Sequence, residues 1–128
     1  MPTTKTAIQK VATVVIGVRD QDAMVDFYVE KLGFNKRIDV PFGNGYRWVE
    51  VAAGDAETTI ALAPPPEGVE IVPRETGISL YTEDIHGYHA ELKEAGVDVD
   101  EQISEMGGPV PPLFWLRDAE GNTLMVVG

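Results

Sequence analysis

The chain has 128 residues, 44% of them hydrophobic, which is enough for one compact core and too few for two ordinary domains. It has no cysteine, so disulfides, thiolate metal sites and a cysteine nucleophile are excluded. Twenty-one acidic against ten basic residues give a formal charge of -11, which repels nucleic acids and anionic lipid surfaces and favours cationic ligands. Residues 1–10 are polar and no apolar run of about 18 residues follows, so the sequence predicts a cytoplasmic protein without a membrane segment.

The first half of the chain follows a β-α-β-β-β pattern. The apolar run Val11–Val18 is rich in β-branched residues and ends at Arg19-Asp20, which predicts a strand followed by a helix N-cap. Apolar residues then recur at helical spacing up to Leu32, and Gly33 is placed to end the helix. Three more strands and a turn are predicted, at 35–40, 46–52, 58–63 and Asn44-Gly45.

The second half repeats this pattern after a proline-rich linker, residues 64–74. Consecutive prolines at 64–66 can continue neither a helix nor a strand ladder. Beyond them Asp84 is a predicted N-cap, 85–95 a helix with one apolar face, and Gly96 its end. The predicted strands of this half are 77–82, 97–103, 113–117 and 122–127.

Residues of matching character recur 64 positions apart, which is half the chain. The pairs are Val14 and Ile78, Ile16 and Leu80, Asp20 and Asp84, Ile60 and Leu124, and Leu62 and Val126. Two copies of one module explain the matched strands and N-caps together. The predicted fold is therefore α+β: a single domain, residues 1–128, with tandem βαβββ modules at about 11–63 and 75–127. Its eight strands form open, mostly antiparallel, concave sheets.

Two segments carry a family resemblance. One runs from Val11 to Phe34 and contains Asp26-Phe27-Tyr28 and Lys31-Leu32-Gly33-Phe34. The other, Phe114 to Asn122, is similar to an aromatic-Arg-Asp-Pro-Asp-Gly-Asn hairpin, with Ala119 in place of the proline. Together they resemble the vicinal oxygen chelate superfamily of glyoxalase, bleomycin-resistance and extradiol dioxygenase proteins. The resemblance implies the two-module fold, and a homodimer, because a second chain usually covers the open concavity in that family.

The resemblance also locates four metal-ligand positions. In that family the first and last strands of each module carry His, Gln or Glu ligands for a divalent ion. The corresponding positions here are Thr13, Ala61, Gly77 and Met125, none of which is a strong ligand for such an ion. We therefore expect no metal and no cofactor, which argues against the usual metal-dependent glyoxalase or dioxygenase activity.

Strand alternation separates a helix-facing side from a cavity side. The helix-facing residues are Val14, Ile16, Val18, Ile60, Leu62, Ile78, Leu80, Leu124 and Val126. Val49 and Val51 belong with them, which turns Tyr46, Trp48 and Glu50 toward the cavity. The predicted ligand-binding residues are Thr13, Tyr46, Trp48, Glu50, Ser79, Tyr81, Trp115 and Met125.

Several of these assignments have alternatives. Glu50 is a candidate general base or cation ligand, or a solvated strand residue. Trp115 lines the cavity or fills the core. His86 and His89 lie in the first turns of the second helix, where exposed histidine is more common than a ligand pair. The segment 105–112 is a lid over the cavity or an ordinary connection.

The favoured function is metal-independent binding of a small molecule, cationic or aromatic, similar to the bleomycin-resistance branch of the family. One alternative is a lyase, isomerase or hydrolase of the same fold with Glu50 as its base and an unusual metal site. Another is a structural or regulatory protein without a ligand. Neither nucleic acid nor a membrane is expected as a partner.

Overall fold

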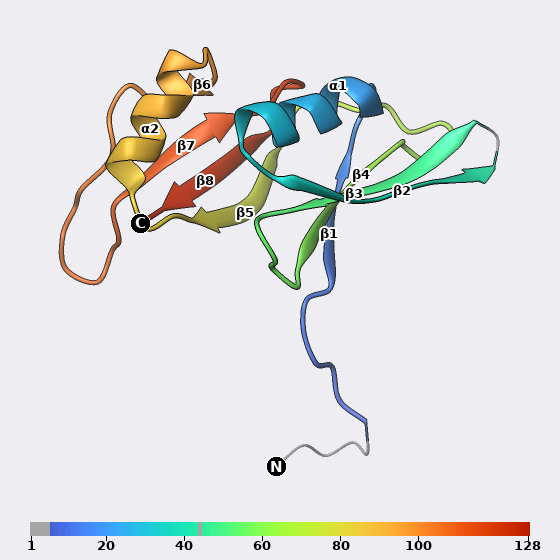
Figure 1. The fold of residues 1–128 in the computed structure, drawn as a ribbon, viewed down its shortest axis with the longest axis horizontal. Helices are drawn as coiled ribbons and strands as arrows, with labels where there is room; N and C mark the ends of the chain where they lie inside the picture. Colours follow the sequence, from blue (N-terminus) through green and yellow to red (C-terminus); the bar gives the residue numbers. More distant parts are fainter. Residues whose placement is uncertain (1–5, 44) are drawn as a thin grey trace.

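The computed structural model describes residues 6–43 and 45–128. Within them, eight strands form two sheets, both covered by helices on the same side (Figure 1). Sheet A has the order β1-β4-β3-β2, made of β1 (Thr13–Gly17), β2 (Asn35–Gly43), β3 (Tyr46–Ala52) and β4 (Thr59–Ala63). Sheet B has the order β5-β8-β7-β6, made of β5 (Glu75–Tyr81), β6 (Asp98–Val99), β7 (Leu113–Arg117) and β8 (Thr123–Val127). The helices are α1 (Gln21–Asp26), continued by the π-helical turn η1 (Phe27–Lys31), and α2 (Ile85–Glu94).

The two sheets share one topology, which confirms the predicted α+β fold of two repeated modules. In each, the first strand pairs parallel with the last strand, and the other pairs are antiparallel. Val15 pairs with Ala61 in sheet A, and Ser79 pairs with Met125 in sheet B. Because both partners shift by the same 64 positions, the repeat extends to the strand register.

Both helices begin and end as predicted. The side chain of Asp20 accepts a hydrogen bond from the Ala23 N–H, and that of Asp84 accepts one from the Gly87 N–H. Gly33 and Gly96 follow the helices with φ of 84° and 81°, a backbone region that glycine enters without steric cost. The Asn44 half of the predicted Asn44-Gly45 turn, and residues 1–5 of the polar N-terminal stretch, lie outside the described residues.

Several strands differ in length from the prediction, among them Thr13–Gly17, which was expected at Val11–Val18. The strand expected at 97–103 is only Asp98–Val99, because the Asp100 carboxylate accepts the Trp115 N–H at 3.1 Å and so takes the place of a ladder carbonyl. The strand expected at 35–40 continues to Gly43. It passes through Pro41, which has no N–H to donate. This is tolerated because β2 is an edge strand and one of its sides has no neighbouring strand to bond to.

The core lies between the helices and the sheets and draws on both halves of the chain. The predicted helix-facing residues Ile16, Val18, Ile60, Leu62, Leu124 and Val126 are all buried, and Ile78 and Leu80 pack against them half-buried. Met24 and Tyr28 from the first helix and Leu92 from α2 complete the same cluster. One continuous core therefore fixes both sheets with the same face inward.

Polar contacts join the two halves. The Tyr28 hydroxyl donates to the Asp118 carboxylate at 2.9 Å, and both side chains are buried. The Glu120 carboxylate accepts the N–H groups of Arg19 and Asp20 at 2.9 and 2.8 Å. Burial, and then the charge of Asp118, raise the pKa of Tyr28 well above its ordinary value. The helix of one module is thus held by the hairpin of the other.

Candidate functional site

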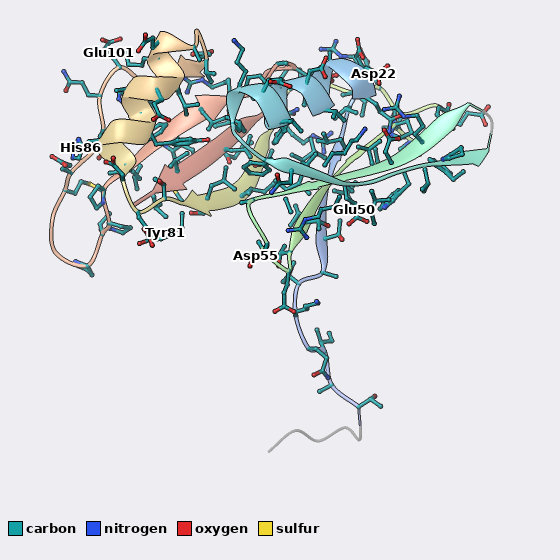
Figure 2. All side chains as sticks on the ribbon, in the orientation of Figure 1. Asp22, Glu50, Asp55, Tyr81, His86 and Glu101 are labelled. Carbon is teal, nitrogen blue, oxygen red and sulfur yellow. The ribbon has the colours of Figure 1, made fainter. Side chains whose placement is uncertain are left out.

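The side of each sheet away from the helices, here called its open face, is where the sequence placed the cavity. On β3, Val49 and Val51 are fully buried against the helices, so the intervening residues point the other way. Tyr46, Trp48 and Glu50 therefore lie on the open face of sheet A. Figure 2 shows Glu50 and Tyr81 projecting from their sheets on the side away from α1.

Four of the side chains on the open face of sheet A form a hydrogen-bonded chain, the Glu50 network. The Trp48 indole N–H donates to Glu50 Oε2 at 2.6 Å, and the Thr59 hydroxyl donates to Glu50 Oε1 at 2.7 Å. Thr59 Oγ1 lies 2.9 Å from Thr13 Oγ1. The network thus runs across β3, β4 and β1, with Thr59 buried and the other three side chains half-buried.

Apolar side chains of β2 lie beside this network. Ile38 is opposite Glu50 in the strand register and Val40 is opposite Trp48. Both stay exposed, at 38% and 49%. At the end of the hairpin Phe42 stacks on Tyr46, with ring centroids 5.9 Å apart. The sequence interpretation missed Ile38, Val40 and Phe42, although the alternation of Ile38 and Val40 with Arg37 and Asp39 is the signal of a strand with one apolar face.

The open face of sheet B carries the remaining predicted ligand residues. Trp115 is directly opposite Met125 in the register, and both are half-buried, whereas Phe114 and Leu116 are buried in the core. Trp115 therefore belongs to the open face. Ser79 pairs with Met125 from the other side and is exposed, and Tyr81 is 73% exposed. This half-site is aromatic and contains a thioether, while that of sheet A contains a carboxylate.

The four family metal positions do not fit a divalent ion. Thr13 has its hydroxyl in contact with Thr59, Ala61 is fully buried, and Met125 supplies only a thioether. Gly77 has no side chain and a φ of 74°, which disfavours any other residue there. In the part of the chain that the structure describes, no three His, Cys, Asp or Glu side chains are grouped so that they could hold a metal ion.

The two histidines of α2 make different contacts. His86 is exposed and lies 3.0 Å from Glu105. His89 is buried, with Nε2 2.7 Å from the Asp100 carbonyl oxygen and its ring edge-to-face with Phe114. These contacts hold the loop 100–105 against α2, so both histidines have structural roles here.

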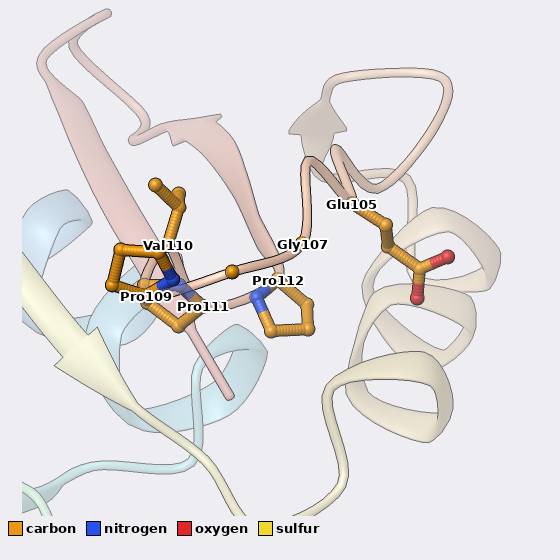
Figure 3. Close-up of a pocket in the computed structure, with 7 residues that line it drawn as sticks. Glu105, Gly107, Pro109, Val110, Pro111 and Pro112 are labelled. Atoms are coloured by element: carbon orange, nitrogen blue, oxygen red, sulfur yellow. The ribbon is translucent and has the colours of Figure 1, made fainter.

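Two hollows of the surface lie away from the Glu50 network. One, of about 360 Å³, is lined by the loop itself, residues 105 and 107–112 (Figure 3). Because no residue of either sheet lines it, this loop is described better as a connection than as a lid. The other, of about 440 Å³, is a groove between the sheets lined by Val14, Ile60, Ile78 and Leu80, and also by the predicted ligand residues Ser79 and Tyr81.

Comparison with known proteins agrees with this geometry. The model of the Glyoxalase/Bleomycin resistance protein/Dioxygenase superfamily matches residues 10–126, and the chain belongs to this superfamily. A member from Sphaerobacter thermophilus DSM 20745 is 34% identical with a TM-score of 0.84, over 94% of this chain and 97% of that one. TnmS3, an antibiotic binding protein from Streptomyces sp. CB03234, is 32% identical with a TM-score of 0.80, over 95% and 97% of the two chains.

A sequence relative extends this similarity to another bacterium. YurT of Bacillus subtilis (strain 168) is 33% identical over 129 residues, which cover 92% of this chain and 98% of YurT.

No helix within residues 6–43 and 45–128 is long and apolar enough to cross a membrane.

Proposed function

We propose that this protein binds a small, partly aromatic organic molecule on the open faces of its sheets, without a metal ion. The observation that carries the proposal is the Glu50 network, a preformed polar group set among exposed apolar side chains. Binding sites for small molecules combine an apolar lining with a few fixed polar groups. The similarity to TnmS3, an antibiotic binding protein, supports an antibiotic-like molecule as the ligand.

A homodimer is part of this proposal. In a single chain Val15 is 59% exposed and Tyr81 is 73% exposed, and the edges of both sheets are unpaired. Exposed apolar side chains and unpaired sheet edges are features of interaction surfaces. A second copy placed over the open faces would convert two shallow half-sites into enclosed ones. Light scattering at micromolar concentration should therefore give twice the mass of one chain, and a monomer would contradict this part.

The enzyme alternative has less support. Glu50 is the predicted base, and in the described chain its side chain is hydrogen-bonded to Trp48 and Thr59 alone. Neither an indole N–H nor a threonine hydroxyl ionises near neutral pH, so neither serves as a partner acid. The contacts of Glu50 favour holding a ligand over transferring its protons.

The test is a thermal-shift screen combined with elemental analysis. Purified protein is heated with cationic antibiotics and planar aromatic metabolites, each with and without a chelator. A ligand that binds only the native state stabilises it by RT ln(1 + [L]/Kd), so the melting temperature rises with the logarithm of the ligand concentration once that concentration exceeds Kd. We expect at least one such compound, with a shift that the chelator leaves unchanged. A shift that disappears on chelation would favour the enzyme alternative.

A further inference from the structure

The Glu50 network has a fixed direction of proton donation. A threonine hydroxyl has one proton to donate. Thr59 donates its proton to Glu50 Oε1, so Thr13 must be the donor in the 2.9 Å contact between the two hydroxyls. The indole N–H of Trp48 is likewise used on Glu50 Oε2. Every polar hydrogen of these side chains therefore points toward the carboxylate.

What the network presents outward is hydrogen-bond acceptors only. Each carboxylate oxygen accepts about two hydrogen bonds, and each oxygen of Glu50 accepts one from the side chains described. The Thr13 oxygen, having given its proton to Thr59, also retains lone pairs. A group that docks here must donate hydrogen bonds, because a second acceptor would meet only lone pairs.

The charge of Glu50 has no cationic partner within the described residues. The basic side chains of the neighbouring strands are all engaged elsewhere: Lys36 with Asp39, Arg37 with the Gly54 carbonyl oxygen, and Arg47 with Asp22 and Asp39. Arg47 also lies on the helix side of β3, because it is two residues from Val49 and alternate residues of a strand point to the same side. A half-buried carboxylate without a counter-charge attracts a cation more strongly than an exposed one does.

We propose that the Glu50 network is an anchor for a protonated amine, and that the ligand is an amine attached to a flat apolar body. The ammonium would donate to Glu50 and Thr13. The body would lie on the Trp48 ring and on Ile38 and Val40, which flank the network and are exposed. This inference rests on the proposed function and adds the chemical class of the ligand.

The test uses two probes of the same shape, 9-aminoacridine, a cation at neutral pH, and acridine, which is neutral at pH 7.5. Titration calorimetry gives the affinity of each for the wild-type protein. Glu50→Gln removes the charge with little change in shape. Glu94→Gln is the matched control, because it removes the same charge from an exposed position of α2 and so preserves any contact made by the network.

We expect the wild-type protein to bind 9-aminoacridine at least about tenfold more tightly than acridine, the ratio typical of one charge-assisted hydrogen bond. Glu50→Gln should bring the two affinities within about threefold of each other, mainly by weakening the cation. Glu94→Gln should leave the ratio as in the wild type. Equal binding of both probes by the wild-type protein, or a ratio that survives Glu50→Gln, overturns the inference and leaves the proposed function standing.

Two further outcomes are also decisive. If neither probe binds the wild-type protein, the inference fails, and the thermal-shift screen alone decides the proposed function. If Glu50→Gln loses acridine as well, the variant has damaged the whole face, and Thr13→Val decides instead. Thr13→Val keeps the carboxylate and removes one acceptor, so it should weaken 9-aminoacridine and leave acridine unchanged. An equal effect on both probes would overturn the inference.

Discussion

Replacing Tyr28 with phenylalanine removes one hydroxyl from the centre of the core and keeps the ring. That hydroxyl donates to Asp118 Oδ2, which also accepts from Asn122 Nδ2 at 3.1 Å. A hydrogen bond to a charged group contributes roughly 1.5–3 kcal/mol. Because Asp118 retains its other donors, we expect Tyr28→Phe to lower the free energy of unfolding by about 1.5–2 kcal/mol, the lower part of that range.

Asp118→Asn should lower the free energy of unfolding more than Tyr28→Phe does. Its Oδ1 accepts the backbone N–H groups of Glu120 and Asn122, and these bonds can persist with an amide oxygen. The new amide nitrogen, however, would face the Asn122 side-chain amide, which donates to the same carboxylate. Asp118 is only 6% exposed. We expect Asp118→Asn to lower the free energy of unfolding by about 3 kcal/mol, because one N–H donor would face another and the remaining hydrogen bonds would lose the charge of their acceptor.

Urea unfolding followed by circular dichroism measures both variants and their double mutant. The double mutant should be less destabilised than the two single changes together, because they share one bond. Tyr81→Phe is the control, since this hydroxyl makes no hydrogen bond among the described residues, and it should leave stability unchanged. If Tyr28→Phe lies within about 0.5 kcal/mol of the wild-type protein, the Tyr28–Asp118 bond does not hold the modules together.

Other predictions concern pH, capping and metal. Burial, and then the charge of Glu91, raise the pKa of Tyr88 to about 12 from 10.0, so the folded state favours the neutral phenol. The contribution of Tyr88 to stability is therefore fully present below pH 10 and is lost between pH 10 and 12. Melting curves across this window should show a smaller loss for Tyr88→Phe than for the wild-type protein. Glu120→Gln weakens the capping of the Arg19 and Asp20 N–H groups and should lower the urea midpoint by an amount equivalent to about 1 kcal/mol, whereas no change would refute the capping. Elemental analysis after dialysis should find no stoichiometric zinc, nickel, iron or manganese, and Met125→Glu alone should add no metal affinity, because such an ion needs at least three placed ligands. One retained equivalent in the wild-type protein would contradict this last prediction.

Local signals in the sequence were sufficient for most of the fold. The alternation from Tyr46 to Ala52 and from Leu113 to Arg117 predicted β3 and β7 with the bounds that the structure has. The offset of 64 predicted which strands correspond, since one repeated module repeats its register. The length of β6 was overestimated because the side chain of Asp100 accepts a hydrogen bond that a strand carbonyl would otherwise accept. Strand propensities describe the backbone and do not account for such a side-chain contact.

The candidate site was only partly predictable. Parity alone placed Trp48 and Glu50 on the same face, because residues two apart in a strand share a side. The contact of Glu50 with Thr59 needs the pairing of β3 with β4, where Glu50 lies opposite Ala61, and no local pattern contains that register. The Tyr28–Asp118 bond joins residues 90 positions apart. The motifs that suggested the family include both residues, but the sequence does not state that they touch.

The two tryptophans report directly on ligand binding to the open faces, because Trp48 lies on the open face of sheet A and Trp115 on that of sheet B. Trp48→Phe and Trp115→Phe each leave one fluorescent reporter, which can be followed while the best compound of the thermal-shift screen is titrated in the presence of EDTA. A ligand bound to both open faces without metal should change the emission of each reporter saturably. A compound that raises the melting temperature while neither tryptophan responds would bind elsewhere, such as the hollow of the loop 105–112, and would contradict the proposed site.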